Sequence, residues 1–214
     1  KTRNWYVQLL KSVEKASMAF ADHVIVSNHL WHEKLIARSV SRGRSSVFIN
    51  HVDLAQFYRH PRTRADDKFI IMFPGGFQWH QGLDIAIEAL ARVKLEVPNA
   101  ELHLYGGGNI QGDLARLTKQ LGLNDSVKFC GSVPHDKIAG VIANADLGIV
   151  PKRSDSFGNE AYSTKIMEFM SQGVPMVVSR TKIDLFYFDD SVVKFFESGN
   201  AEAMADAMLQ VIKS

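Results

Sequence analysis

The sequence predicts an α/β protein with a doubly wound, mostly parallel sheet, and three observations support this fold class. Short apolar segments alternate with amphipathic segments of helical length along most of the chain. Several strand segments end directly at glycines, as at Gly75 and at 106–108. Helical segments end at Pro98, Gly122 and Gly173. Helices that connect consecutive strands act as crossovers, which place the strands parallel.

The first fifty residues predict two helices and two short strands. Tyr6, Leu10 and Val13 recur at helical spacing and predict an amphipathic helix. Ser27 and Asn28 follow a short apolar strand and can cap a second helix. The expected elements are a helix over 6–20, a strand over 24–26, a helix near 29–40 and a strand over 46–50. The polar segment 53–67 then marks a linker or boundary.

The rest of the chain continues the alternation more regularly. Leu83, Ile87 and Leu90 mark one face of a helix that Pro98 ends. The expected strands are 69–73, 101–105, 127–130, 146–150, 176–179 and 192–196, and the expected helices lie near 82–97, 110–121, 135–144, 163–172 and 200–213. In such sheets a ligand lies off the carboxyl ends of the strands. The loops to inspect are therefore 74–82, 106–109, 131–134, 151–164 and 180–190.

The composition is that of an ordinary globular protein. The 214 residues allow one domain or one and a half, and the net charge of +2 is too near balance to indicate nucleic acid as a partner. The single cysteine, Cys130, is typical of a reducing compartment, so we expect a cytoplasmic protein, or one peripheral at the membrane. The chain begins at Lys1 without an initiator Met or a signal peptide, which leads us to expect a piece of a longer chain.

The loop 151–164 contains the strongest chemical signal. It precedes a predicted helix, whose N-terminus offers unpaired N–H groups and a positive dipole end to a phosphate. Ser163 and Thr164 are cap residues that indicate this N-terminus. Three cations bring positive charge to the same end of the sheet, as a diphosphate requires: Lys152, Arg153 and Lys165.

Two glutamates, Glu160 and Glu168, flank the start of the same helix. Both can face a ligand that lies across the helix N-terminus, where a carboxylate accepts hydrogen bonds from paired sugar hydroxyls such as a ribose diol. Alternatively, Lys165 and Glu168 form a surface pair three residues apart on the helix. Spacing alone supports the two interpretations equally.

The segment from Glu160 to Pro175 resembles the signature of retaining glycosyltransferases of the GT-B fold, family 4 or group 1 type. The two glutamates with seven residues between them, followed by Gly-Val-Pro, are the core of this resemblance. Collinear matches extend it over about residues 14–212: Asn50-x-Val52-Asp53, 104–108, 131–134 and 143–151.

The resemblance implies a cleft between two Rossmann-like domains, of which this chain contains one. Residues 1–53 would be the end of the N-terminal acceptor domain, 54–199 the nucleotide-sugar-binding C-terminal domain, and 200–214 a helix that crosses back. The parent enzyme would transfer a sugar from a UDP- or GDP-sugar to a glycan, lipid or small-molecule acceptor, with retention at the anomeric carbon. The piece itself would bind the donor without turnover, because the other wall of the cleft belongs to the missing N-terminal part.

The resemblance also implies residue roles. Glu160 would hold the transferred sugar and Glu168 the ribose, while the backbone at Ser163 and Thr164 would meet the diphosphate and the peptide groups near Val133 the base. No metal and no cofactor are expected, so positive side chains, with Lys165 as a catalytic residue, would neutralise the departing diphosphate.

One loop departs from the family pattern. The family places an arginine and a lysine where this chain has Gly76 and Gln81. We therefore expect Lys152, Arg153 or Lys165 to substitute, with Gly75 and Gly76 letting the backbone approach the phosphates.

Three further expectations bear on function. The uncharged loop leaves an alternative open, a non-catalytic domain of the same fold that mediates assembly. A nucleotide-sugar epimerase of related fold is a third interpretation. His29 and His32 lie three residues apart, but no third ligand is nearby in the sequence, so we expect no zinc site.

Overall fold

The computed structural model describes residues 4–214. It divides into two compact units, Lys1–Asn50 and His51–Ser214. The division lies close to the boundary predicted after residue 53, and the assignment of the first unit to another domain stays a prediction. Within the described residues, no helix is both long and apolar enough to cross a membrane.

The first unit contains the predicted elements in the predicted order. They are α1 (Trp5–Phe20), β1 (Val24–Val26), α2 (His29–Ile36) and β2 (Ser45–Val47), with β1 and β2 parallel. Helix α2 ends four residues before the predicted bound, and a 3-10 turn that was not predicted (Arg42–Arg44) precedes β2. The Asn28 side chain caps α2 by accepting from the Trp31 N–H at 2.9 Å, as expected. The His32 Nε2 lies 2.9 Å from the Ser45 Oγ, so this buried histidine joins α2 to β2. Residues 4–214 contain no cluster suited to a metal ion.

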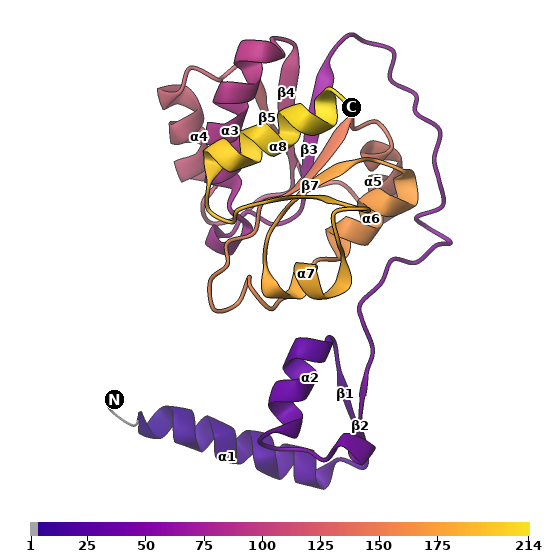
Figure 1. The fold of residues 1–214 in the computed structure, drawn as a ribbon, viewed down its shortest axis with the longest axis vertical. Coiled ribbons are helices and arrows are strands. Elements are labelled where there is room, and N and C mark those ends of the chain that lie inside the picture. The colour runs from indigo at the N-terminus through magenta and orange to yellow at the C-terminus, as the bar shows by residue number, and fades with distance from the viewer. Residues whose placement is uncertain (1–3) are drawn as a thin grey trace. The chain divides into compact units, whose positions relative to one another are not determined.

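The second unit is built on one six-stranded parallel sheet with the order β5-β4-β3-β6-β7-β8 (Figure 1). The strands are β3 (Phe69–Pro74), β4 (Ala100–Tyr105), β5 (Val127–Gly131), β6 (Leu147–Val150), β7 (Met176–Ser179) and β8 (Lys194–Phe196). The helices are α3 (Leu83–Glu96), α4 (Gln111–Gln120), α5 (His135–Ile142), α6 (Thr164–Gln172), α7 (Lys182–Tyr187) and α8 (Ala201–Ile212), with a 3-10 turn at Trp79–Gln81. The doubly wound parallel sheet is confirmed.

Among the described residues, the short helix α7 is the α-helix that the sequence pattern did not predict. Its six residues contain too few turns to show a helical period. The segment 180–190 was therefore expected only as a loop. Thr181 caps the helix through its side chain, which accepts from the Asp184 N–H.

The core of the second unit lies on both faces of the sheet. Strand residues alternate between the faces, so that Ile71 and Phe73 pack with α3 and α8, whereas Met72 packs with α5 and α6. The last helix, α8, is part of this core through Met204 and Met208, both fully buried. Whether it also contacts another domain stays a prediction.

The polar segment 53–67 is bound to the second unit along its length. Phe57 is buried beside α5 and α6. The Gln172 side chain accepts from the His60 N–H at 2.9 Å and donates to the Tyr58 carbonyl at 3.0 Å. The Asn144 side chain accepts from the Thr63 and Arg64 N–H groups, each at 2.9 Å. This segment is therefore a strap on the C-terminal unit, despite its linker-like composition.

Gly148 on β6 should tolerate no side chain. A methyl group there would lie 2.7 Å from the Phe169 ring, in a fully buried place. Gly148→Ala should therefore lower the free energy of unfolding by about 1–3 kcal/mol, the usual cost of overpacking a core. Denaturant unfolding measures this. Gly112→Ala on α4 meets nothing within 4 Å and is the control; it should leave stability unchanged or raise it by about 0.5 kcal/mol.

Candidate functional site

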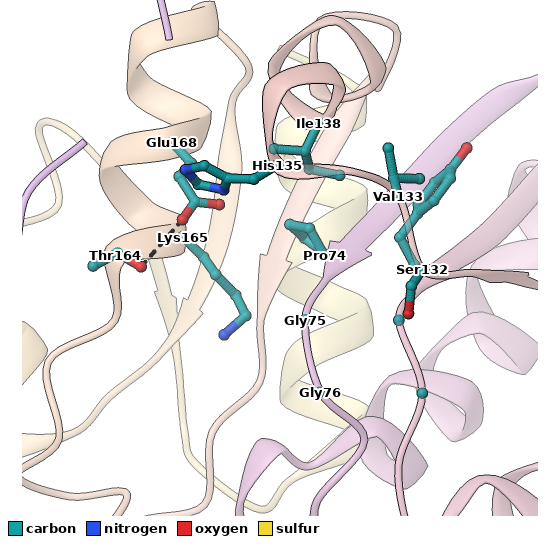
Figure 2. A pocket seen from close by; sticks show the side chains of 13 residues that line it. Pro74, Gly75, Gly76, Ser132, Val133, His135, Ile138, Thr164, Lys165 and Glu168 are labelled. Carbon is teal, nitrogen blue, oxygen red and sulfur yellow. Dashed lines mark hydrogen bonds between the residues drawn. The ribbon is translucent and has the colours of Figure 1, made fainter. Parts of the chain in front are cut away.

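A cavity of about 410 Å³ opens at the carboxyl edge of the sheet (Figure 2). The ends of β3 and β4, the loop between β5 and α5, and the first turns of α5 and α6 form its wall. The lining residues are Pro74, Gly75, Gly76, Tyr105, Gly106, Gly107, Ser132, Val133, His135, Ile138, Thr164, Lys165 and Glu168. The strand order reverses between β3 and β6, so the cavity lies at the switch point where sheets of this kind bind ligands.

Two glycines shape the floor of the cavity. Gly75 has φ +147°, and a Cβ there would lie 2.5 Å from the Lys165 Cε. Gly106 has φ +128°, and a Cβ there would collide with the Gly75 carbonyl oxygen. The ends of β3 and β4 can approach each other and Lys165 only because both positions lack a side chain.

Lys165 presents a positive charge to the cavity. Its side chain extends from α6 toward the turn at Gly75 and Gly76 (Figure 2), and its Nζ lies 5.2 Å from the centre of the Phe73 ring. Within residues 4–214 it makes no hydrogen bond and no ion pair. Burial lowers the pKa of Lys165, while the nearby Glu168 opposes this shift. An anion in the cavity would supply the partner that this ammonium lacks.

Glu168 faces the same cavity, one turn further along α6. The Thr164 hydroxyl donates to its Oε1 at 3.1 Å and fixes the carboxylate (Figure 2). Lys165 and Glu168 form no ion pair across the described helix, and both line the cavity. The geometry therefore favours the ligand-facing interpretation of these residues over a surface pair.

The other two predicted cations are held by carboxylates. Lys152 is 3% exposed, and its Nζ lies 2.8 Å from the Asp184 Oδ2 and 2.8 Å from the Ala161 carbonyl oxygen. Arg153 pairs with Asp84 and stacks over the Trp79 ring, with its Cζ 3.7 Å from the ring centre. Neither lines the cavity, so of the three candidates only Lys165 reaches it.

Three more predicted residues lie outside the cavity wall. Glu160 is half-buried in the turn before α6, in the segment that Lys152 holds. Ser163 is the N-cap of α6, and its Oγ is buried without a hydrogen-bond partner. Gln81 ends the 3-10 turn after β3, where its Oε1 is also buried without a partner.

The cavity wall also contains four residues that the sequence pattern did not indicate as ligand-binding. Tyr105, Ser132, His135 and Ile138 contribute side chains to its wall. The His135 ring lies 5.7 Å from the Phe57 ring, which anchors it from behind. Tyr105 ends β4 and Ser132 follows β5, whereas His135 and Ile138 lie in the first turn of α5, directly after the loop 131–134 that the sequence predicts to face a ligand. Position along the sheet could therefore have indicated them, although residue type could not.

The fold and the cavity together define a Rossmann-like α/β domain with a cavity at the switch point of its parallel sheet, where such sheets bind ligands. A family model described as glycosyl transferases group 1 matches residues 55–214. The match covers most of the chain, which therefore belongs to the group 1 glycosyl transferases.

The chain is similar to several curated glycosyltransferases over part of their length. It is 25% identical to the phosphatidylinositol N-acetylglucosaminyltransferase gpi3 subunit of Schizosaccharomyces pombe, over 78% of this chain and 36% of that protein. It is 29% identical to the D-inositol 3-phosphate glycosyltransferase of Mycolicibacterium smegmatis, over 74% of this chain and 40% of that protein. The chain thus spans less than half the length of these relatives.

Solved structures share the fold. Anabaena HepE in complex with UDP superposes with a TM-score of 0.80 at 19% identity, over 100% of this chain and 60% of that one. Sucrose-phosphate synthase from Thermosynechococcus elongatus superposes with a TM-score of 0.77 at 23% identity, over 97% and 53% of the two chains. The GT-B glycosyltransferase fold expected from the sequence is confirmed.

Removal of the Lys165 charge should stabilise the protein while it harms binding. The folded state holds this proton less tightly than the unfolded chain does, because burial lowers the pKa of Lys165. Lys165→Met should therefore raise the free energy of unfolding at pH 7, by about 1 kcal/mol. The gain should shrink as the pH rises toward 10.5, the ordinary lysine value, where the unfolded chain also loses the charge.

Denaturant unfolding between pH 7 and pH 10 measures this effect. Lys119→Met, on the exposed face of α4, is the matched control and should change little at any pH. A loss of stability in Lys165→Met at pH 7 would contradict the interpretation of Lys165 as an unpartnered cation.

Proposed function

We propose that this chain contains the donor-binding domain of a retaining glycosyltransferase, and that its cavity binds a nucleoside diphosphate sugar. The observation with most weight is Lys165, whose ammonium has no hydrogen-bond or ion-pair partner among residues 4–214 and lies in a cavity at the switch point of the sheet. Membership of the group 1 family and the UDP bound in the HepE structure both support a nucleotide-sugar donor.

Each part of the ligand has a matching part of the cavity. The diphosphate would lie between Lys165 and the N-terminus of α6 at Ser163 and Thr164, where the helix dipole adds to the positive potential. The glycine turns at Gly75 and Gly76 allow phosphate oxygens to approach the backbone.

The nucleoside would occupy the other end of the cavity. Glu168, fixed by Thr164, would accept hydrogen bonds from the ribose hydroxyls. The base would lie against the backbone near Val133. The loop after β3 has the uncharged Gly76 and Gln81 where the family places two cations. Lys165 on α6 would supply a positive charge to the diphosphate in their place.

The chemical step needs few protein groups. The bond from the anomeric carbon to the diphosphate oxygen breaks, and the acceptor oxygen bonds to the same face of the sugar. The departing phosphate oxygen takes the acceptor proton, while Lys165 stabilises the negative charge that develops on the diphosphate. Glu160 would hold the hydroxyls of the transferred sugar. Neither a metal ion nor a cofactor enters this scheme.

We assign residues 1–53 to the end of an N-terminal acceptor domain and expect α8 to cross back toward it. The remainder of that domain would supply the other wall of the cleft for a glycan, lipid or small-molecule acceptor. The chain by itself would bind donor without turnover, and the enzyme would act in the cytoplasm or at the membrane periphery.

Calorimetry with UDP, GDP and ADP tests the donor site. One nucleotide should bind clearly more tightly than the others. Glu168→Ala should weaken it about tenfold or more, because a hydrogen bond to a charged group contributes about 1.5–3 kcal/mol. Lys165→Met should weaken it by a similar factor. Glu88→Ala on the exposed face of α3 is the control and should bind as the wild type does.

The negative outcomes separate the alternatives. If no nucleotide binds the wild-type chain, the proposal fails and a non-catalytic assembly domain becomes the better explanation. Conversion of a free nucleotide sugar without any acceptor would instead indicate an epimerase.

The stereochemistry tests the reaction class in the full-length enzyme. The product should have the same anomeric configuration as the donor, which proton NMR of the newly formed glycoside measures. Inversion would exclude the same-face mechanism.

A further inference from the structure

A buried ion pair behind the cavity links three loops at the carboxyl edge of the sheet. Lys152 follows β6 and Asp184 lies in α7; their side chains are 4% and 0% exposed, and the Nζ and Oδ2 atoms lie 2.8 Å apart. The Thr181 hydroxyl donates to the same Oδ2 at 2.6 Å. The Ser198 hydroxyl, beyond β8, donates to the Lys152 carbonyl at 2.9 Å. Both the side chain and the backbone of Lys152 are therefore held.

The third partner of the ion pair is the backbone of the segment 159–163. The Lys152 Nζ donates to the Ala161 carbonyl oxygen at 2.8 Å. Two further bonds attach this segment to α7: the Ile183 N–H donates to the Asn159 carbonyl at 3.1 Å, and the Lys182 N–H donates to the Asn159 side chain at 2.8 Å. Glu160 lies between the two attached residues.

Stability alone does not explain such a pair. Two charges removed from water lose hydration that their attraction often fails to restore, and apolar residues of equal volume often serve a fold as well. The second oxygen of Asp184 is buried without a hydrogen-bond partner, which adds to the cost. A lysine, however, has several donors on one nitrogen, so it can bind a carboxylate and a backbone carbonyl at once.

We propose that Lys152 and Asp184 are positioning residues, whose buried ion pair holds segment 159–163 so that Glu160 is set for the donor's sugar. This inference rests on the proposed function for the role of Glu160. It assigns Lys152 to the support of the donor site and not to direct contact with the diphosphate. Helix α7 would then serve to position Asp184 for this ion pair.

The test compares wild type with Lys152→Met/Asp184→Asn, which removes both charges together, so that neither member of the pair is left as an unpaired buried ion. Hydrogen–deuterium exchange followed by mass spectrometry should show amides in 159–163 exchanging at least about tenfold faster, while β3 and α3 keep their protection. Lys182→Met is the matched control, because it makes the same substitution at an exposed residue of α7. Its exchange should equal that of wild type.

Calorimetry then separates positioning from general support. UDP and GDP serve as nucleotide probes, with UDP-glucose and GDP-mannose as the matching sugar nucleotides. In the double variant the affinity for the sugar nucleotide should fall about fivefold, the equivalent of one net hydrogen bond, while the affinity for the nucleotide alone changes less than about twofold.

Other outcomes overturn the inference or its premise. Unchanged exchange in 159–163 would sink it, as would an equal loss of affinity for nucleotide and sugar nucleotide. If the wild type binds no nucleotide while exchange rises only in 159–163, the positioning of the segment is supported and the proposed donor function fails. The two failures are therefore distinguishable.

Discussion

Parallel strands all end at the same edge of their sheet, and here that edge is divided by a reversal of strand order between β3 and β6. The connections to β4 and β5 go one way and those to β7 and β8 the other, so no crossover covers the gap between the two central strands. The loops after β3 and β6 flank that gap. Every feature of the candidate site depends on this arrangement, because it brings Gly75 and Lys165 together from positions ninety residues apart in the sequence.

Three cations at this edge of the sheet make different contacts, and the residues around each one determine those contacts. Lys152 is enclosed and neutralised by Asp184. Arg153 is shared between the Asp84 carboxylate and the Trp79 ring. Lys165 points into the cavity, where the glycine at 75 leaves room for its side chain; Glu168 lies nearby, but Lys165 forms no ion pair within residues 4–214. A cation without an ion-pair partner in the protein can bind an anionic ligand. A cation that is paired with a carboxylate instead holds the loops in place.

The parallel sheet and most of its elements could be predicted from the sequence, because strand and helix periods are local properties. The cavity wall at Gly75, Gly76, Val133 and Thr164 could be predicted too, since strand ends and caps indicate the carboxyl edge. The separation of Lys152 from Lys165 could not. This difference depends on the ion pair between Lys152 and Asp184. Helix α7, which contains Asp184, is too short to show a helical period, and Asp184 is too far from Lys152 in the sequence for their contact to be predicted. The positions given to Glu160, Ser163 and Gln81 in ligand binding stay predictions.

The strap formed by residues 53–67 belongs to the C-terminal unit, so the N-terminal boundary of this unit lies before the strap and not at β3. Its composition is that of a flexible connector, yet Phe57 fills the core, and Gln172 and Asn144 bind its backbone. A version of the unit that began at β3 would lack Phe57 and expose the apolar residues that it covers. The side-chain amides of Gln172 and Asn144 would also lose their hydrogen-bond partners in the strap. The smallest autonomous piece of this protein is therefore set by hydrogen bonds that reach back from α6 and from the turn after α5. Any recombination of this unit with a different N-terminal part should make its junction before the strap.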